Sequence, residues 1–255
     1  MAKIPKTANT EVVSTEVSDV EVVDEVVDSE EVSTEVLIEV LNGRREFYLA
    51  LAGFYFAPLT QEQIDAMAQT DYSEFGVGEP LLEEGFNDIT RVLRKRNTGT
   101  RQMLAIDFTS SFGGAATYKG KTAMPYASLF LSEEHLLSQF PRGEVFRVFK
   151  RNLLRVIDEN TPDDHLSFML EFLSIMSERA ADALREGNLE EAQACLKESR
   201  DFITDQILTW FDAFTEAAQT LLEVRFYRGV LKVTKGYLLM DLQTIDDLLE
   251  GMLQL

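Results

Sequence analysis

The sequence predicts an all-α protein in which a single helical bundle domain follows an acidic N-terminal tail. Apolar residues recur at intervals of three and four from about residue 34 to the C-terminus, and no segment shows a convincing strand pattern. A chain of 255 residues with 45% hydrophobic content can bury one sizeable core. Residues 1–33, in contrast, are of low complexity. We therefore expect a tail over residues 1–33 and one helical domain over residues 34–255.

The tail repeats Glu-Val and Asp-Val steps between Thr10 and about Ser33, without glycine or an aromatic residue. The alternation superficially suits a strand, but one acidic strand without a hairpin partner cannot satisfy its backbone, so we favour a disordered or loosely helical tail. Residues 1–40 hold eleven acidic residues against two lysines, a charge of −9 out of −20 for the chain. An acidic arm that competes for a basic partner or guards a binding groove is the functional alternative.

The first half of the helical region shows three apolar stripes separated by loop signals. Thr60 and Gln63 match a capping box and predict the start of a short helix. Residues 76–80 contain two glycines and a proline and predict a loop. The stripe over residues 82–93 is followed by a further helix over residues 101–112. The residues expected on one face of the first helix are Val36, Val40, Phe47, Leu51 and Phe54.

The second half shows stronger helical periodicity. We expect helices over residues 144–156, 166–184 and 189–214, each with apolar residues at spacings of three and four. Gly187 and Asn188 are predicted to end one helix and cap the next. Stripes of this spacing are what bundle packing requires, so a helical bundle is the predicted architecture.

Charge and cysteine content restrict the function classes. A net charge of −20 argues against nucleic-acid binding, because phosphate neutralisation needs a basic face, and it favours cationic partners. Cys195 is the single cysteine and no zinc-ligand spacing occurs, so we expect a reducing, cytoplasmic location. The longest uninterrupted apolar run, residues 47–59, is short against the ~20 residues of a membrane span. No export signal is visible at the N-terminus, and stable membrane insertion is not expected.

Few residues offer catalytic chemistry. With only His135 and His165, a multi-histidine metal site is excluded. Asp163, Asp164 and His165 could in principle bind a metal, which leaves a metal-dependent helical hydrolase as an alternative, although consecutive residues rarely converge on one ion. A weak nucleotidase is a second alternative, because residues 113–122 (GGAATYKGKT) end like a phosphate-binding loop. However, the pattern G-x-x-x-x-G-K-T needs a glycine where Ala115 stands, and Gly114 lies one residue too early. No buried strand precedes this segment either. We expect no enzyme.

Two groups of basic residues stand out. Arg147, Arg151 and Arg155 recur every four residues on one predicted helix. A second group lies within residues 91–96. Solvated helix faces are the simplest interpretation. The alternative is contact with a phosphate-bearing ligand such as a pterin dinucleotide, since guanidinium groups pair bidentately with phosphate.

Residues 125–172 carry the most specific signal. With one residue added at each end, they contain the segments MPYASLFLSEEHLL, GEVFRVFKRNLL and TPDDHLSFMLEFL, which resemble the TorD/DmsD/NarJ family of molybdoenzyme maturation chaperones. The family has a Y-x-S-x-Y-L segment and, downstream, an E-P-x-D-H-L loop that runs into a helix. Residues matching the first segment are Tyr126, Ser128, Phe130 and Leu131, and those matching the second are Pro162, Asp163, Asp164, His165, Leu166, Glu171 and Phe172.

The resemblance covers roughly residues 40–250 and has two departures. Thr161 stands where the family has glutamate, and Glu159 lies two residues earlier. Phe130 replaces a common tyrosine, which keeps the aromatic ring and removes the hydroxyl. A role that depends on the missing glutamate therefore does not transfer directly.

The resemblance implies a cytoplasmic chaperone that binds the twin-arginine signal peptide and the apo-enzyme of a molybdopterin-dependent oxidoreductase. Such a chaperone holds the precursor for cofactor insertion before export. No permanent cofactor is implied, while the client's molybdopterin guanine dinucleotide or GTP is expected to bind transiently. The implied partners include molybdenum cofactor biosynthesis proteins, and the chain is expected to be a monomer or a domain-swapped homodimer. The alternative is a nitrate-reductase-type assembly factor that acts without reading an export signal.

A receptor for such a signal peptide needs carboxylates beside an apolar groove, because the peptide presents two guanidinium groups followed by an apolar stretch. Pro162 restricts Thr161 to extended geometry and holds the loop out of the neighbouring helices. Asp163 or Asp164 could instead cap the next helix. His165 is either held by a carboxylate or sensitive to client binding. The candidate client-binding residues are Tyr126, Phe130, Leu131, Asp158, Glu159, Thr161, Pro162, Asp163, Asp164, His165 and Glu171.

Overall fold

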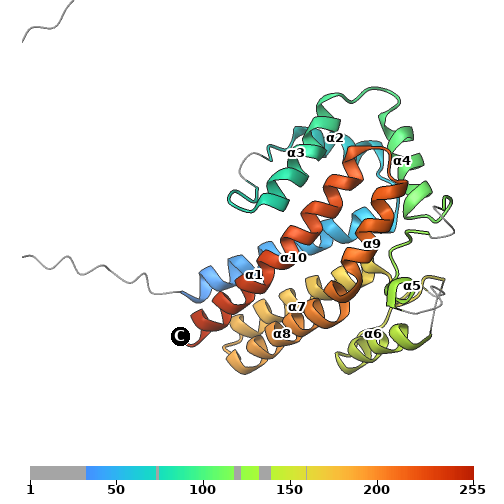
Figure 1. The fold of residues 1–255 in the computed structure, drawn as a ribbon. Coiled ribbons are helices and arrows are strands. Elements are labelled where there is room, and N and C mark those ends of the chain that lie inside the picture. The colour runs from blue at the N-terminus through green and yellow to red at the C-terminus, as the bar shows by residue number, and fades with distance from the viewer. Residues whose placement is uncertain (1–32, 73–74, 118–121, 132–138, 159) are drawn as a thin grey trace, which may run out of the picture. The chain divides into compact units, whose positions relative to one another are not determined.

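The described part of the chain is helical, which confirms the all-α prediction. A computed structural model describes residues 33–72, 75–117, 122–131, 139–158 and 160–255, with side chains from residue 143 onward in the fourth range. The tail predicted for residues 1–33 lies outside these residues except for Ser33, which caps the first helix. The helices shown in Figure 1 are α1 (Thr34–Phe56), α2 (Gln61–Gln69), α3 (Pro80–Arg94), α4 (Thr100–Ser111), α5 (Ala127–Leu131), α6 (Gln139–Arg151), α7 (Leu166–Arg185), α8 (Leu189–Phe202), the π-helical turn η1 (Ile203–Ile207), α9 (Leu208–Leu221) and α10 (Arg225–Met252).

Several helix ends follow from local sequence signals. The Thr60 hydroxyl accepts the Gln63 backbone N–H at 3.2 Å, and the Gln63 side chain accepts the Thr60 N–H at 2.8 Å, so the predicted capping box is confirmed. Gly187 adopts φ +74° after α7, and the Asn188 side chain caps α8. These predictions succeed because each depends on residues only a few positions apart.

Three long helices share one buried polar network. α1 packs against α7, α7 against α8, and α10 against α3. The Arg44 guanidinium of α1 donates to Asp241 of α10 at 2.6 and 2.8 Å, and to the Ser177 hydroxyl of α7 at 3.0 Å. Tyr48 donates to the same carboxylate at 2.5 Å. If the helices shifted, Arg44 and Asp241 would be buried as unpaired charges, which is costly. The network therefore fixes the register of α1, α7 and α10.

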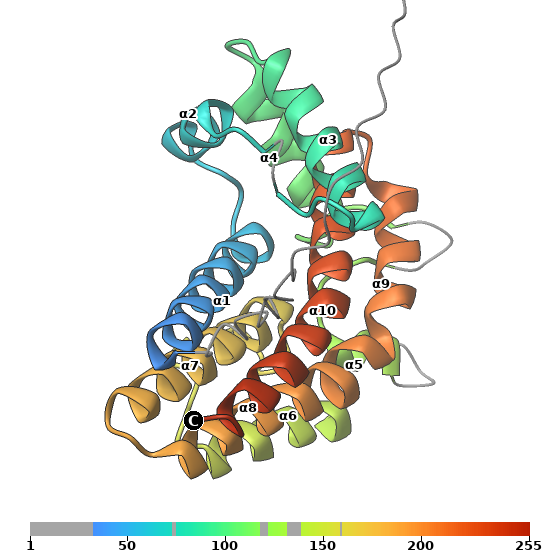
Figure 2. The same ribbon diagram turned by 90° about the vertical axis from the view of Figure 1, so that its left-hand side faces the viewer.

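The crossing of α3 and α10 depends on two glycines. A Cβ at Gly229 would lie 2.6 Å from the Gly85 carbonyl oxygen, and a Cβ at Gly85 would lie 2.7 Å from the Gly229 oxygen. No other residue fits there without moving a backbone. In Figures 1 and 2, α3 lies with α2 and α4 at one end of the helical domain, and α5 and α6 lie at the other.

The predicted apolar face of α1 is partly wrong. Val36 is 53% exposed and Val40 is also exposed, whereas Leu37, Leu41 and Tyr48 are buried. The buried face of α1 includes Arg44, a residue that an apolar pattern excludes. Its pairing with Asp241, 197 residues away, explains why the periodicity was misleading.

The helix predicted over residues 144–156 ends earlier. α6 stops at Arg151, and Leu153 follows in the left-handed region with φ 58°. The Leu154 N–H donates to the Phe149 oxygen at 2.8 Å and the Leu153 N–H to the Lys150 oxygen at 3.1 Å. These are the two bonds of a Schellman motif, with leucine in the usual glycine position. Arg155 therefore lies in a loop and not on the helix of Arg147 and Arg151.

Candidate functional site

The two segments that carry the family resemblance lie side by side. Tyr126 and His165 form an isolated antiparallel β-bridge, the only one among the described residues. The Ala127 N–H donates to the Asp164 carbonyl at 3.1 Å, and the Leu166 N–H donates to the Pro125 carbonyl at 2.8 Å. Backbone hydrogen bonds thus hold the loop before α7 against the start of α5.

Asp164 supports this junction from inside. Its side chain is 0% exposed, and its Oδ2 accepts the Ser128 N–H at 2.8 Å, near the beginning of α5. Its Oδ1 is buried without a hydrogen-bond partner. Direct contact between Asp164 and a client peptide is therefore a prediction that we correct, because neither oxygen reaches the surface in this structure.

His165 caps α7, which corrects the prediction that Asp163 or Asp164 does so. The His165 Nδ1 accepts the Ser167 N–H at 3.2 Å, so this nitrogen carries no proton. Burial lowers the pKa of His165 to about 4, and the imidazole is neutral at pH 7. The side chain is also buried, so it supports the site and does not form its surface.

Aromatic rings surround the imidazole in place of the carboxylate considered from the sequence. Tyr126 and Phe56 lie edge-on, with ring centroids 4.8 and 6.3 Å from that of the imidazole, and Phe168 is tilted at 5.8 Å. Phe56, at the end of α1, is about half exposed. These ring contacts join the end of α1, the start of α5 and the first turn of α7.

The turn before Pro162 is organised by Asp158. Its carboxylate accepts the Thr161 hydroxyl at 2.7 Å and the Asn160 N–H at 2.9 Å. The Thr161 hydroxyl, and then the Asn160 N–H, hold the pKa of Asp158 below its usual value. Thr161, Pro162 and Asp163 are half-buried, and the predicted Glu159 lies outside the described residues.

A groove with a volume of about 390 Å³ opens between this loop and α7, and we call it the loop groove. Its polar lining residues are Arg155, Asp158 and Glu171. Partial burial raises the pKa of Glu171. Its apolar lining residues are Phe149, Leu154, Val156, Ile157, Phe168, Phe172 and Ile175.

The loop groove can hold an apolar segment while placing two carboxylates beside it. Asp158 and Glu171 supply negative charge at the rim, and Arg155 offsets part of it. Ile157 is 87% exposed at the same rim. This composition is that of a binding surface for a chain with apolar and cationic groups.

The α5 residues in the predicted site divide between core and surface. Phe130 stacks on Trp210 with centroids 5.8 Å apart and contacts Phe214 edge-on at 5.7 Å. It therefore anchors α5 to α9. Because Phe130 is only partly buried, its client contact stays a prediction. Tyr126 is half-buried beside His165, and Leu131 is exposed.

Of the three arginines predicted to meet a phosphate group, only Arg147 and Arg151 lie on one helix in the structure. Arg147 pairs with Glu144 at 2.9 Å, and Arg151 pairs with Glu198 at 2.6 Å. Arg155 lies apart from them in the loop groove. The three residues do not fit a common phosphate site, because two are neutralised by carboxylates and the third faces another hollow.

Sequence reasoning missed most of the apolar lining of the loop groove. Phe168, Phe172 and Ile175 recur at spacings of four and three, and they form a second stripe on α7 beside the core stripe. That spacing is a signal that could have located the groove. Ile157 had no such signal, because its exposure depends on the early end of α6.

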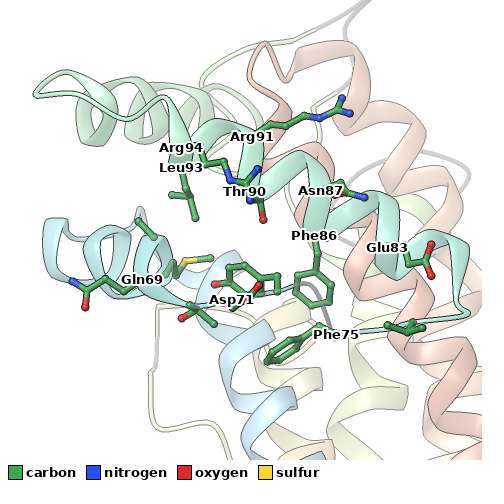
Figure 3. A pocket seen from close by; sticks show the side chains of 15 residues that line it. Gln69, Asp71, Phe75, Glu83, Phe86, Asn87, Thr90, Arg91, Leu93 and Arg94 are labelled. Atoms are coloured by element: carbon green, nitrogen blue, oxygen red, sulfur yellow. The ribbon is translucent and has the colours of Figure 1, made fainter. Parts of the chain in front are cut away.

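A second hollow, which the sequence did not predict, lies between α2 and α3. It has a volume of about 710 Å³. Phe75 and Phe86 lie together at its base in Figure 3, edge-on with centroids 5.5 Å apart. Tyr72 stacks on Phe86 at 5.2 Å. Arg91 and Arg94 contribute cations to its lining.

The described residues offer no metal centre. No group of three or more His, Cys, Asp or Glu side chains among them is placed to hold an ion. Asp164 and His165 are committed to separate backbone N–H groups, at Ser128 and Ser167. Among the described residues, this loop therefore does not present the set of metal ligands that a metal-dependent hydrolase needs. None of the described helices is both long enough and apolar enough to span a bilayer.

An all-helical domain with these two joined segments matches a known family. Residues 79–216, more than half of the chain, match the family described as nitrate reductase delta subunit, so the chain belongs to that family. The resemblance to the TorD/DmsD/NarJ chaperones is thereby confirmed.

Curated relatives extend the match over most of the chain. Chaperone protein TorD of Vibrio vulnificus (strain YJ016) is 27% identical over 213 residues, which cover 80% of this chain and 95% of the relative. Chaperone protein TorD of Vibrio parahaemolyticus is 28% identical over 214 residues, with the same coverage of 80% and 95%. Chaperone protein TorD of Aliivibrio fischeri is 25% identical over 206 residues, covering 78% and 93%.

Proposed function

We propose that this protein is a cytoplasmic, non-enzymatic chaperone for the precursor of a molybdopterin-dependent oxidoreductase. It binds the twin-arginine signal peptide of the precursor in the loop groove and holds the apo-enzyme until its cofactor is inserted. The observation that carries the proposal is the loop groove itself, in which apolar side chains lie beside Asp158 and Glu171. The names of the relatives and the family match support the chaperone role.

The chemistry of the peptide accounts for the composition of the groove. The apolar stretch of a signal peptide gains free energy by leaving water, and the groove offers Phe149, Phe168 and Ile157 to receive it. The two guanidinium groups need carboxylates within reach, and Asp158 and Glu171 supply them. Thr161, Pro162 and Asp163 form the adjoining turn and are the further contacts that we propose.

Calorimetric titration with a twin-arginine signal peptide tests this proposal. Glu171→Lys replaces attraction by repulsion at the rim, and we expect the Kd to rise about ten-fold or more. The matched control is Glu216→Lys, an exposed glutamate on α9 outside the groove, which should change the Kd less than two-fold. Binding of a peptide with both arginines replaced by glutamine at the wild-type Kd would contradict the proposal.

A second candidate is favoured by the family description, which names a nitrate reductase subunit and no export signal. In that case the chain assembles a molybdoenzyme without reading a leader peptide. Co-purification with a precursor that lacks its signal peptide separates the two functions. Retention of the truncated precursor at full yield supports the assembly factor, and its loss supports signal-peptide binding.

Cofactor contact and oligomeric state stay predictions of this proposal. Transient binding of the client's molybdopterin guanine dinucleotide or of GTP is assigned to no residues, because Arg147, Arg151 and Arg155 do not fit a common phosphate site. Contact with molybdenum cofactor biosynthesis proteins follows from the proposed role alone. Sedimentation velocity distinguishes the predicted monomer from the domain-swapped homodimer.

A further inference from the structure

A further groove, distinct from the loop groove and from the hollow between α2 and α3, has the opposite charge to the loop groove. It lies at the end of the domain that holds α2, α3 and α4. It has a volume of about 770 Å³ and lies between α3, α4 and the start of α10. We call it the α4 groove. Its cations are Arg91, Lys95 and Arg225, and none of its lining residues is acidic. In a chain with 44 acidic and 24 basic residues, such a lining departs strongly from the average surface.

The cations of the α4 groove are largely available to a ligand. Arg91 lies in the last turn of α3 and Lys95 is the C-cap residue of this helix, four positions later. Both are exposed, line the groove and have no ion pair among the described residues. Arg225 is 3.3 Å from Asp88, but that carboxylate is shared with Lys232 at 2.8 Å. Among the described residues, Arg91 and Lys95 are therefore not neutralised, and Arg225 is neutralised only in part.

Helix dipoles explain only part of this cluster. Arg91 and Lys95 lie at the C-terminal end of α3, where the helix dipole favours positive charge. Arg225 is the first residue of α10, where the dipole disfavours it. A cation at that position is stabilised by a negative group, and a ligand in the groove would supply one beyond Asp88.

An apolar strip continues the α4 groove away from its cations. Val92 and Val224 are half-buried in the groove, Met103 is 41% exposed, and Ile106 is 59% exposed one turn further along α4. A neighbouring hollow of about 440 Å³ shares Met103 and Val224 and reaches Ile106. Exposed apolar strips of this kind mark interaction sites, and methionine adapts to varied partners.

We propose that the α4 groove binds an acidic, amphipathic segment of a partner protein. The carboxylates of the segment meet Arg91, Lys95 and Arg225, and its apolar side chains lie on Val224, Met103 and Ile106. A small phosphate-bearing ligand would use only the cationic end and leave the apolar strip uncovered. A second copy of this chain is disfavoured because each copy has a charge of −20.

Charge complementarity separates the two grooves by partner. The loop groove has Asp158 and Glu171 at its rim and suits a cationic leader, whereas the α4 groove suits an anionic segment. Glu223 and the buried Asp107 line the neighbouring hollow that reaches Ile106, so the positive charge is confined to the end of the α4 groove next to α3. An acidic segment therefore binds in one direction, with its carboxylates toward α3.

Fluorescence anisotropy with the full chain tests the proposal. The probe is a fluorescein-labelled peptide with four glutamates followed by a short amphipathic leucine helix, and a second probe has four lysines instead. We expect the glutamate probe to bind, the lysine probe not to bind at this site, and Lys95→Glu to raise the Kd of the glutamate probe about five-fold or more. Met103→Gln should weaken binding independently, because it removes apolar contact without a change in charge.

Lys197→Glu is the matched control, since Lys197 is an exposed lysine of α8 outside the groove. An equal loss of affinity in this control would overturn the proposal, because only net charge would then matter. Failure of the glutamate probe to bind would overturn it as well. Displacement of the probe by inorganic pyrophosphate, with no effect of Met103→Gln, would reassign the groove to a phosphate ligand.

Discussion

His165 is held neutral by its surroundings, and this gives the loop a defined response to pH. Its Nδ1 accepts a backbone N–H at the start of α7, and aromatic rings exclude water from the imidazole. Protonation would remove the acceptor and leave a buried charge. The folded state therefore binds a proton at His165 less readily than the unfolded chain does.

The pH dependence of stability follows from this shift. The pKa of His165 is about 4 in the folded protein, against ~6.5 when unperturbed, so its contribution is present above pH 6.5 and is lost as the pH falls toward 4. We expect the unfolding free energy to drop by about 2 kcal/mol from this residue between pH 7 and pH 5. Urea unfolding of His165→Asn, which keeps a capping side chain but does not titrate, should show a flatter dependence. An unchanged slope in this variant would exclude His165 as the source.

Asp164 acts as an internal support. Asp164→Ala leaves the Ser128 N–H without its acceptor in a buried position, and we expect a loss of about 1–3 kcal/mol in unfolding free energy. Glu171→Ala is the comparison, because the Glu171 side chain reaches the surface, is only partly buried, and accepts no buried backbone N–H among the described residues. Urea titration monitored by circular dichroism measures both. Equal stability of the two variants would contradict the supporting role of Asp164.

Single residues could be predicted from the sequence only where their partners are near in the chain. The caps at Thr60 and Asn188 depend on residues three positions away, and both are confirmed. The burial of Asp164 depends on Ser128, 36 residues earlier. Sequence spacing therefore identified the loop before α7 but assigned its buried support to the binding surface.

At the scale of helices, the site depends on where α6 ends. The left-handed residue Leu153 closes α6 two residues after Arg151 and directs the following segment across α7. That segment supplies Arg155, Ile157 and Asp158 to the loop groove. Helical periodicity continues through Val156, so the apolar pattern does not predict that α6 ends at Arg151.

The α3–α10 crossing gives a direct test of helix packing. Gly229→Ala places a methyl group 2.6 Å from the Gly85 carbonyl oxygen, and we expect it to cost about 1–3 kcal/mol through forced separation of the helices. Gly53→Ala on α1 is the control, because nothing lies within 4 Å of the added atom. That change should stabilise the protein by about 0.5–1 kcal/mol through helix propensity. Thermal unfolding compares the two, and a Gly229→Ala variant as stable as Gly53→Ala would show that the crossing is looser than described.

For the whole molecule, the net charge does not show where charged residues gather on the surface. The net charge of −20 predicted a cationic partner, and the acidic rim of the loop groove agrees with that expectation. Composition could not show that Arg91, Lys95 and Arg225 gather in one groove, because they come from two helices far apart in sequence. The helical class was predictable from periodicity, whereas the grooves depend on how the helices cross.

Site-specific photo-cross-linking tests the central claim most directly. A photoreactive phenylalanine derivative at Ile157, which is 87% exposed at the loop groove, should cross-link to a twin-arginine signal peptide. The same group at Leu239, an exposed residue of α10 outside the groove, should not, and excess unlabelled peptide should abolish the product at Ile157. Cross-linking that is equal at both positions, or that occurs only at Leu239, would contradict binding in the loop groove.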